Sequence, residues 1–293
     1  MKKIFGNKRT IAIFVLPTFL LYAVFALVPI IYNFVISAYS TNLMKPGVFV
    51  GFRNYLNLFT DSIFKKSLRN NVLVMIGSLA AHLPFALLLA HLLFQKIKGS
   101  NFFQTIFFFP CVICGVAVGM LWKFIYHSDI GLVNSILELI GRSDLCKTWL
   151  GDKNTAMICI IIVIMWQYVG YHMIIQLAAM KSIPGELYEV AKIDGANEWQ
   201  LFSHITLPLI RNILAIDAVL IITGALKYYD LVAVMTNGGP NHATELMSTY
   251  MYYMGFRTLK YGYSAAIGVV MLILCMVSVR LANAVFKREA IEY

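Results

Sequence analysis

The chain has 293 residues, of which 60% are apolar or aromatic and only 13% are charged. A soluble domain carries about a quarter charged residues because its surface faces water, so this composition excludes a soluble globular protein. The 20 Phe, 16 Tyr and 4 Trp exclude a disordered chain, and five cysteines are too few for a disulfide scaffold. The net charge of +10 fits basic loops beside anionic lipid better than nucleic-acid binding.

Six apolar segments are long enough to cross a membrane as helices. A membrane-spanning helix needs about 20 mostly apolar residues. The fifth segment contains Arg211 and Asp217, but it is counted because the region after the fourth would otherwise be long and apolar in its middle. The predicted spans are 11–38, 71–94, 102–122, 155–180, 207–226 and 261–279. The predicted fold class is therefore all-α, a polytopic membrane protein with six transmembrane helices.

The distribution of Lys and Arg predicts that both termini lie in the cytoplasm. If residues 1–10 lie on the cytoplasmic side, the inner loops hold 10 Lys or Arg among 52 residues. The outer loops then hold 11 Lys or Arg among 97 residues. The density of positive charge is then nearly double inside, as the positive-inside rule expects. The basic residues Lys2, Lys3, Lys8 and Arg9 weigh most, because the first helix usually dominates the orientation.

The segment 181–206, between the fourth and fifth spans, predicts two short helices at the inner membrane surface. Pro184 suits the first turn of a helix, Gly195 predicts its end, and Asn197 can cap the second helix. Each helix has about ten residues and is about 15 Å long, too short to cross a bilayer. Apolar residues recur along each: Leu187, Val190 and Ala191 on the first, and Trp199, Phe202 and Ile205 on the second. These faces either pack on the inner ends of the spans or, for the first helix, fit a groove on another protein.

Spans four and five each carry a face that suits a polar solute. The spacing places Ile164, Gln167, Tyr168 and Tyr171 together on span four, and Ile221, Gly224, Ala225 and Tyr228 together on span five. Aromatic rings offer flat apolar faces to sugar C–H groups, an amide offers hydrogen bonds, and glycine leaves room. The candidate substrate-binding residues are Gln167, Tyr168, Tyr171, Gly224 and Tyr228. The alternative is that the tyrosines only pack between helices or lie at the membrane interface.

The other notable features within the spans are an acid, a glycine pair, a cysteine pair and three histidines. Asp217 indicates either proton coupling or a hydrogen bond to a neighbouring helix or a partner subunit. Gly115 and Gly119 form a G-x-x-x-G that allows close helix packing, inside the chain or between subunits. The C-x-x-C of 111–114 is interpreted as small apolar side chains in lipid. His82 and His91 on the second span and His172 on the fourth show no clear ligand spacing, so no metal site and no catalytic residues are predicted.

Several motifs resemble those of a known family. Residues 189–196, Glu-Val-Ala-Lys-Ile-Asp-Gly-Ala, followed by Trp199, Phe202, Ile205 and Leu207-Pro208, resemble the "EAA" loop of the membrane subunits of ATP-binding-cassette importers. Further matches are Phe49-Val-Gly-Phe-Arg-Asn-Tyr55, the stretch from Trp166 to Pro184, Thr236-Asn-Gly-Gly-Pro240 and Gly262-Tyr-Ser-Ala-Ala266. Together they are similar to the carbohydrate-uptake permeases, of the type with Asn-Gly-Gly-Pro after the fifth span. Val190 stands where the motif has alanine, a small change.

This resemblance implies a fold, a set of partners and a role for the loop. The expected fold is that of a type I importer permease, one transmembrane domain over 1–293 with 181–206 as its coupling loop, in the bacterial cytoplasmic membrane. The chain contains no G-x-x-x-x-G-K-[ST] loop, so ATP would be hydrolysed by a separate cytoplasmic ATPase dimer and no cofactor is expected on this chain. The residues expected to contact the ATPase are Leu187, Glu189, Ala191, Asp194, Gly195 and Ala196. A second permease subunit, membrane lipid and an extracellular solute-binding protein are the other expected partners.

The predicted function is half of the translocation path of an ATP-driven sugar importer, without enzyme activity. The same class importing another polar solute, such as glycerol phosphate, is one alternative, and an ATP-independent secondary transporter or channel is another. A membrane enzyme would need a reactive constellation that the sequence does not show. The outer loops 127–154 and 229–263 are long enough to receive the binding protein, although the Tyr- and Met-rich stretch 244–256 would equally suit helix packing.

Overall fold

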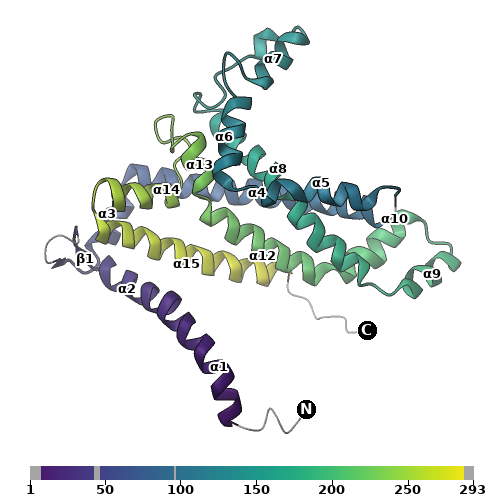
Figure 1. Ribbon diagram of the computed structural model, residues 1–293, viewed down its shortest axis with the longest axis horizontal. Coiled ribbons are helices and arrows are strands. Elements are labelled where there is room, and N and C mark those ends of the chain that lie inside the picture. Colours follow the sequence, from purple (N-terminus) through teal and green to yellow (C-terminus); the bar gives the residue numbers. More distant parts are fainter. Residues whose placement is uncertain (1–7, 43–46, 96, 287–293) are drawn as a thin grey trace. The chain divides into compact units, whose positions relative to one another are not determined.

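The structure, a computed structural model, describes residues 8–42, 47–95 and 97–286, and these are almost entirely helical (Figure 1). The chain folds into two compact units. The first contains the residues up to Asp61 together with Met251–Leu272, and the second contains Ser62–Tyr250 and the residues from Ile273 on. By length and composition, four helices could cross a membrane, or up to six if each of two bent helix pairs is one span. The all-α, six-span prediction is thereby confirmed for the described part of the chain.

The first unit begins with one long apolar span. Helix α1 (Lys8–Tyr22), a π-helical turn η1 (Ala23–Leu27) and α2 (Val28–Ser37) follow one another without a break. The 18 most apolar residues of this span are not buried by the rest of the chain, and Phe14 and Phe25 are both 77% exposed. Such a surface needs lipid or another protein to cover it.

A short hairpin and two motif segments hold one end of the first unit together. Strands β1 (Tyr39–Ser40) and β2 (Val48–Phe49) pair antiparallel, and α3 (Arg53–Thr60) follows them. The Asn54 side chain donates to the carbonyl oxygens of Ser37 (2.8 Å) and Tyr39 (3.0 Å), which lie at the end of α2 and in β1. A Cβ on Gly262 would overlap the Tyr39 carbonyl, so this position requires glycine. The motifs at 49–55 and 262–266 are therefore structural parts of this unit.

The second unit is built around α4 (Ser62–Phe94) and α8 (Ala156–Lys181), which pack along each other. Helix α5 (Ser100–Val112) approaches α8 so closely that a Cβ on Gly170 would overlap the Phe107 carbonyl. Helix α12 (Arg211–Lys227) packs on both α4 and α8. Buried apolar side chains form one cluster around Ile160, Val163 and Ile164 and another around Met173, Leu177 and Met180.

The predicted spans three (102–122) and five (207–226) are each interrupted by a bend. Span three consists of α5 and α6 (Gly115–Ile125), which meet at 98° across two residues in extended conformation, Ile113 and Cys114. Span five is preceded by the helical run Glu198–Leu209, which meets α12 at 67°. Prolines lie shortly before both bends, at 110 and 208, and proline weakens helical hydrogen bonding.

Several short elements lie between the long helices. Gly115 and Gly119 of α6 pack against α13 (Asp230–Met235), so this G-x-x-x-G serves packing within the chain. The segment 127–154 contains α7 (Leu132–Leu139) and η2 (Ser143–Leu145), and Asn134 holds it by accepting from the Trp149 indole at 2.7 Å. Residues 244–250, which include the start of α14 (Met247–Tyr252), are all buried, which supports the packing interpretation of this stretch. A π-helical turn η4 (Tyr253–Arg257) and the long helix α15 (Tyr261–Phe286) end the described chain.

Candidate transport cavity and coupling loop

A cavity of about 400 Å³ lies between α8, α12 and the start of α13. All five candidate substrate-binding residues line it: Gln167, Tyr168, Tyr171, Gly224 and Tyr228. Its volume falls within the range of about 300–1,000 Å³ that small-molecule sites occupy. Two residues of the predicted faces do not reach it, because Ile164 and Ala225 are fully buried in the hydrophobic core behind the cavity.

The aromatic and amide groups of the cavity are held in fixed positions. The rings of Tyr168 and Tyr228 lie 5.8 Å apart and pack on the core. The Gln167 amide donates to the Ile113 carbonyl at the bend of span three (3.2 Å). Tyr171 is 39% exposed. A set of rings and an amide fixed in this way can stack on sugar rings and bind hydroxyl groups.

Gly224 provides open space in the wall of the cavity. A Cβ built on this glycine meets no atom within 4 Å. Small side chains are therefore sterically tolerated there, whereas a large one would project into the cavity.

Asp217 makes hydrogen bonds to the neighbouring helix, as one of its two interpretations expected. This fully buried carboxylate accepts from His172 Nδ1 and from Gln176 Nε2, both at 2.7 Å and both on α8. His172 also lines the cavity, and its ring centroid lies 5.0 Å from that of His82 on α4. The sequence did not predict that His82, His172 and Asp217 lie together, and no local signal could have paired His172 with an acid 45 positions away.

The mouth of the cavity carries charge that the sequence analysis missed. Lys227 at the end of α12 and Asp230 at the start of α13 both line it, on either side of Tyr228 and Tyr229. Their proximity to Tyr228 in the sequence was the available signal. They give the site one cationic and one anionic group beside the rings.

The coupling loop contains the two predicted helices. The first is α9 (Gly185–Ile193), and Gly195 follows it in the left-handed conformation with φ +84°. The amide of Gly195 donates to the Lys192 carbonyl (3.0 Å) and that of Ala196 to the Ala191 carbonyl (2.9 Å), which closes the helix end. The prediction that glycine ends this helix is confirmed.

Most side chains of the first helix and its turn face solvent. Of the six predicted contact residues, Leu187, Glu189, Asp194 and Gly195 are exposed, and Ala191 and Ala196 are half-buried. The apolar side chain of Ile193 is 85% exposed. The helix is nevertheless anchored, because the Tyr188 hydroxyl bonds Thr206 Oγ1 (2.9 Å) and its ring packs on Phe94 of α4.

The second helix of the loop is capped as predicted and packs partly on the spans. It comprises α10 (Glu198–Gln200), a π-helical stretch η3 (Leu201–Thr206) and α11 (Leu207–Leu209). Asn197 accepts from the Gln200 amide (2.9 Å), and the Gln200 side chain accepts from the Asn197 amide (2.8 Å), a complete capping box. Phe202 packs on His91, whereas Trp199 is 72% exposed.

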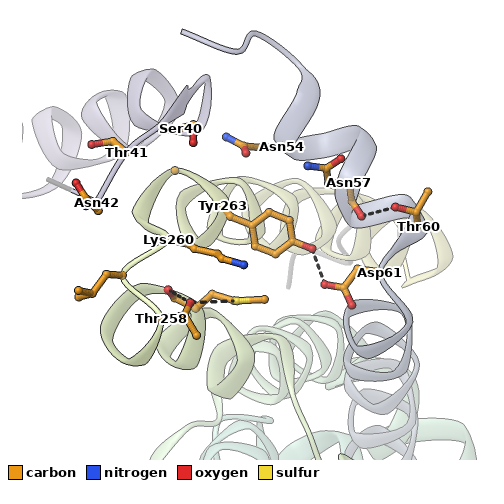
Figure 2. Close-up of a pocket in the computed structure, with 13 residues that line it drawn as sticks. Ser40, Thr41, Asn42, Asn54, Asn57, Thr60, Asp61, Thr258, Lys260 and Tyr263 are labelled. Atoms are coloured by element: carbon orange, nitrogen blue, oxygen red, sulfur yellow. Dashed lines mark hydrogen bonds between the residues drawn. The ribbon is translucent and has the colours of Figure 1, made fainter. Parts of the chain in front are cut away.

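A second cavity, of about 750 Å³, lies entirely in the first unit (Figure 2). Its lining is mostly hydroxyl and amide groups, among them Asn54, Asn57 and Thr60. The Tyr263 hydroxyl donates to Asp61 at 2.5 Å across it, and the side chain of Lys260 lies beside this pair. The sequence analysis did not identify this cavity, although two of the motif segments supply Asn54 and Tyr263. Because their side chains support the local fold, the first cavity remains the better candidate for transport.

Known proteins resemble this chain over most of its length. Residues 82–290 match the family described as "Binding-protein-dependent transport system inner membrane component". The chain is 37% identical to the probable ABC transporter permease protein YurN of Bacillus subtilis, over 92% of this chain and 93% of that protein. It is 34% identical to the lactose transport system permease protein LacF of Rhizobium radiobacter, over 90% of each. A chain of the bacterial alginate ABC transporter, solved in complex with an alginate pentasaccharide-bound periplasmic protein, matches with a TM-score of 0.84, 26% identity and coverage of 99% and 97%.

Proposed function

We propose a sugar-import function for this chain, which belongs to the family of inner membrane components of binding-protein-dependent transport systems. The chain is a membrane permease subunit and forms half of a translocation path that is powered by ATP. The observation that carries the proposal is that the five candidate residues from two separate spans line one cavity. The transported solute passes through this cavity.

The solute class is sugar, and oligosaccharides above all. The relatives include a lactose permease and an alginate transporter. The cavity supports this assignment because it combines four tyrosine residues with a fixed amide. Stacked rings and directional hydrogen bonds are what a ligand with apolar C–H faces and hydroxyl edges requires. One cationic side chain, Lys227, also lies at the mouth, and this favours glycerol phosphate as the second candidate solute.

The chain couples to a cytoplasmic ATPase dimer through the loop 181–206. The sequence has no phosphate-cradling loop of its own, so the nucleotide chemistry resides in that partner. Exposed Leu187, Glu189, Asp194 and Gly195, with Ala191 and Ala196 beside them, form the docking surface. A short exposed helix that ends in a glycine turn suits a groove on another protein.

A second permease subunit and an extracellular solute-binding protein complete the assembly. The exposed apolar surface of the first span is covered by lipid and by the second subunit. The outer segment 127–154 receives the binding protein, and its exposed apolar residues Leu139 (86%) and Ile140 (63%) support this role. The chain acts as one permease domain with both termini in the cytoplasm. The end residues 1–7 and 287–293, which carry part of the charge argument for this orientation, lie outside the described residues.

Reconstitution of the complex tests the proposal. The chain, its partner permease and the ATPase are placed in proteoliposomes with the binding protein, and uptake of radiolabelled lactose, maltotriose, diacetylchitobiose and glycerol 3-phosphate is measured with and without ATP. We expect ATP-dependent uptake of at least one sugar. Uptake of glycerol 3-phosphate alone would select the second candidate, and uptake without ATP would reject the proposal.

Gly224 supplies the matched variants for the cavity. Gly224→Ala adds a methyl group into open space, so it should leave uptake within about twofold of the unmodified chain, whereas Gly224→Trp should lower uptake by at least about tenfold by filling the cavity. If Gly224→Trp transports the solute as fast as Gly224→Ala and the unmodified chain do, the solute takes another path.

A further inference from the structure

The polar groups beside the transport cavity exceed what helix packing requires. Asp217 is fully buried, and Gln176 is fully buried with it. A buried charge within a membrane span is costly, and replacement of such pairs by apolar residues is often tolerated by the fold. Only one side chain of this cluster, His172, also lines the cavity. The cluster therefore connects a buried carboxylate to the surface that the solute meets.

The ring of His172 has one nitrogen committed and one available. Its Nδ1 lies 2.7 Å from Asp217 Oδ1, and because a carboxylate only accepts hydrogen bonds, Nδ1 carries the proton. Among the described residues none hydrogen-bonds Nε2. Neighbouring rings pack against His172 at centroid distances of 5.0 Å (His82) and 5.2 Å (Tyr171), so its orientation is set by its surroundings.

We propose that His172 contacts the transported sugar, that its Nε2 accepts a hydrogen bond from a sugar hydroxyl, and that Asp217 and Gln176 are positioning residues that hold the ring. This inference rests on the proposed function. The carboxylate selects the tautomer of the neutral ring that has its lone pair at Nε2. A hydroxyl donor of the solute then meets an oriented acceptor among the tyrosine rings.

The network also predicts which change at Asp217 is tolerated. Gln176 Oε1 is buried and has no hydrogen-bond partner in the described structure. In Asp217→Asn the amide oxygen can still accept from His172 Nδ1, and its NH₂ group can donate to Gln176 Oε1 once the Gln176 amide has turned over. The charge is lost, but the hold on the ring remains. Asp217→Asn should therefore keep most uptake, whereas Asp217→Leu should not.

The first test uses the unmodified complex. Diethyl pyrocarbonate modifies accessible neutral histidine, and peptide mass spectrometry resolves the modified sites. We expect modification of His172 that a saturating concentration of the best-transported sugar suppresses. His82, which is 1% exposed, should stay unmodified with and without sugar. Lack of reaction at His172, or reaction that sugar does not slow, would overturn the proposal.

The second test separates sugar contact from a purely structural role. In His172→Asn the amide nitrogen replaces Nδ1 and can still donate to Asp217, but nothing replaces Nε2. We expect at least about tenfold slower uptake with binding-protein-stimulated ATP hydrolysis retained, since one oriented hydrogen bond is lost. Uptake within about twofold of the unmodified chain would contradict the contact. If this variant does not assemble, the histidine modification experiment decides the question.

Monodeoxy derivatives of the best-transported sugar give the final discrimination. Each is compared between the unmodified chain and His172→Asn, so that the preference of the binding protein cancels in the ratio. The derivative that lacks the hydroxyl group donating to Nε2 should be transported at the same rate by the unmodified chain and by His172→Asn. A constant ratio across all derivatives would assign His172 a structural role only. Because the unmodified chain must transport the parent sugar first, failure of the proposed function is seen separately, before any variant is compared.

Discussion

The coupling loop and the transport cavity are held in shape by different kinds of contact. The loop is exposed, and its one described ion pair, Lys192–Glu198 at 3.4 Å, has side chains that are 58% and 67% exposed. The cavity is backed by the pair His172–Asp217 at 2.7 Å, whose side chains are 7% and 0% exposed. The loop depends on local backbone features, a cap and a left-handed glycine. The cavity depends on contacts between helices that are distant in sequence.

This difference suggests a division of work. A loop that is held by local bonds can move as one piece when a partner pulls it. A cavity whose walls belong to α8 and α12 changes shape only when those helices move relative to each other. Tyr188 anchors the loop, because it ties α9 to Thr206 and to Phe94 of α4.

The largest effect on uptake is expected at the turn of the loop. Gly195→Asp should lower uptake by at least about 30-fold while the protein remains in the membrane, because it strains a left-handed turn and places a charge on the docking surface. Uptake by the reconstituted complex and the amount of chain in the membrane are the measurements.

Gly99 offers a matched control for this substitution. It also has a positive φ (+83°), and a Cβ there would make only ordinary contacts with Phe103, but it lies outside both the loop 181–206 and the segment 127–154. Gly99→Asp therefore carries the same backbone strain and should retain uptake. Equal losses in the two variants would assign the effect to strain and not to docking.

The next largest difference concerns the stability that the two pairs contribute. Asp217→Ala leaves two buried donors, on His172 and Gln176, without their acceptor, which should cost about 2–6 kcal/mol of unfolding free energy. Glu198→Ala removes an exposed partner and should cost about 0–1 kcal/mol. Thermal unfolding midpoints of the detergent-purified complexes compare the two. A larger drop of the unfolding midpoint in Glu198→Ala than in Asp217→Ala would contradict this expectation.

A smaller effect on transport is expected in the wall of the cavity. Tyr171→Ala removes a half-exposed ring, so uptake should fall about three- to tenfold while the binding protein still stimulates ATP hydrolysis. Tyr253 is 49% exposed and does not line the cavity, so Tyr253→Ala is the control and should transport normally. Unchanged uptake by Tyr171→Ala would remove this residue from the site.

The smallest effect is expected at the cap of the second loop helix. Asn197→Ala breaks the capping box and should cost about 1 kcal/mol of helix stability, with uptake within about twofold of the unmodified chain. Asn197→Ser should restore the cap. A loss of uptake as large as that of Gly195→Asp would mean that the whole loop, and not its first helix and turn, forms the docking surface.

The parts of the structure that the sequence predicted are those governed by local rules. Apolar length predicted the spans, and Gly195 and Asn197 predicted where the loop helices end and begin. Helical spacing brought Gln167, Tyr168 and Tyr171 to one face, and the same rule placed Gly224 and Tyr228 together.

Long-range features escaped the same reasoning. At the bend of Ile113 and Cys114 the Ile113 carbonyl is bonded by Gln167, which lies 54 positions away. Ile164 and Ala225 share the periodicity of the cavity residues but face the core, because a helical face is wider than the cavity that it lines. The pairing of His172 with Asp217 depends on how α8 packs on α12.

The central claim is that movement at the turn of the loop changes access to the cavity. It is tested most directly by labelling Tyr171→Cys with a membrane-impermeant thiol reagent in the reconstituted complex, with and without ATP, and by locating the label by peptide mass spectrometry. We predict that ATP changes the labelling rate of the chain that carries Tyr171→Cys alone. In the chain that carries both Tyr171→Cys and Gly195→Asp, the labelling rate should be the same with and without ATP. The same ATP-dependent change in both chains would contradict the account.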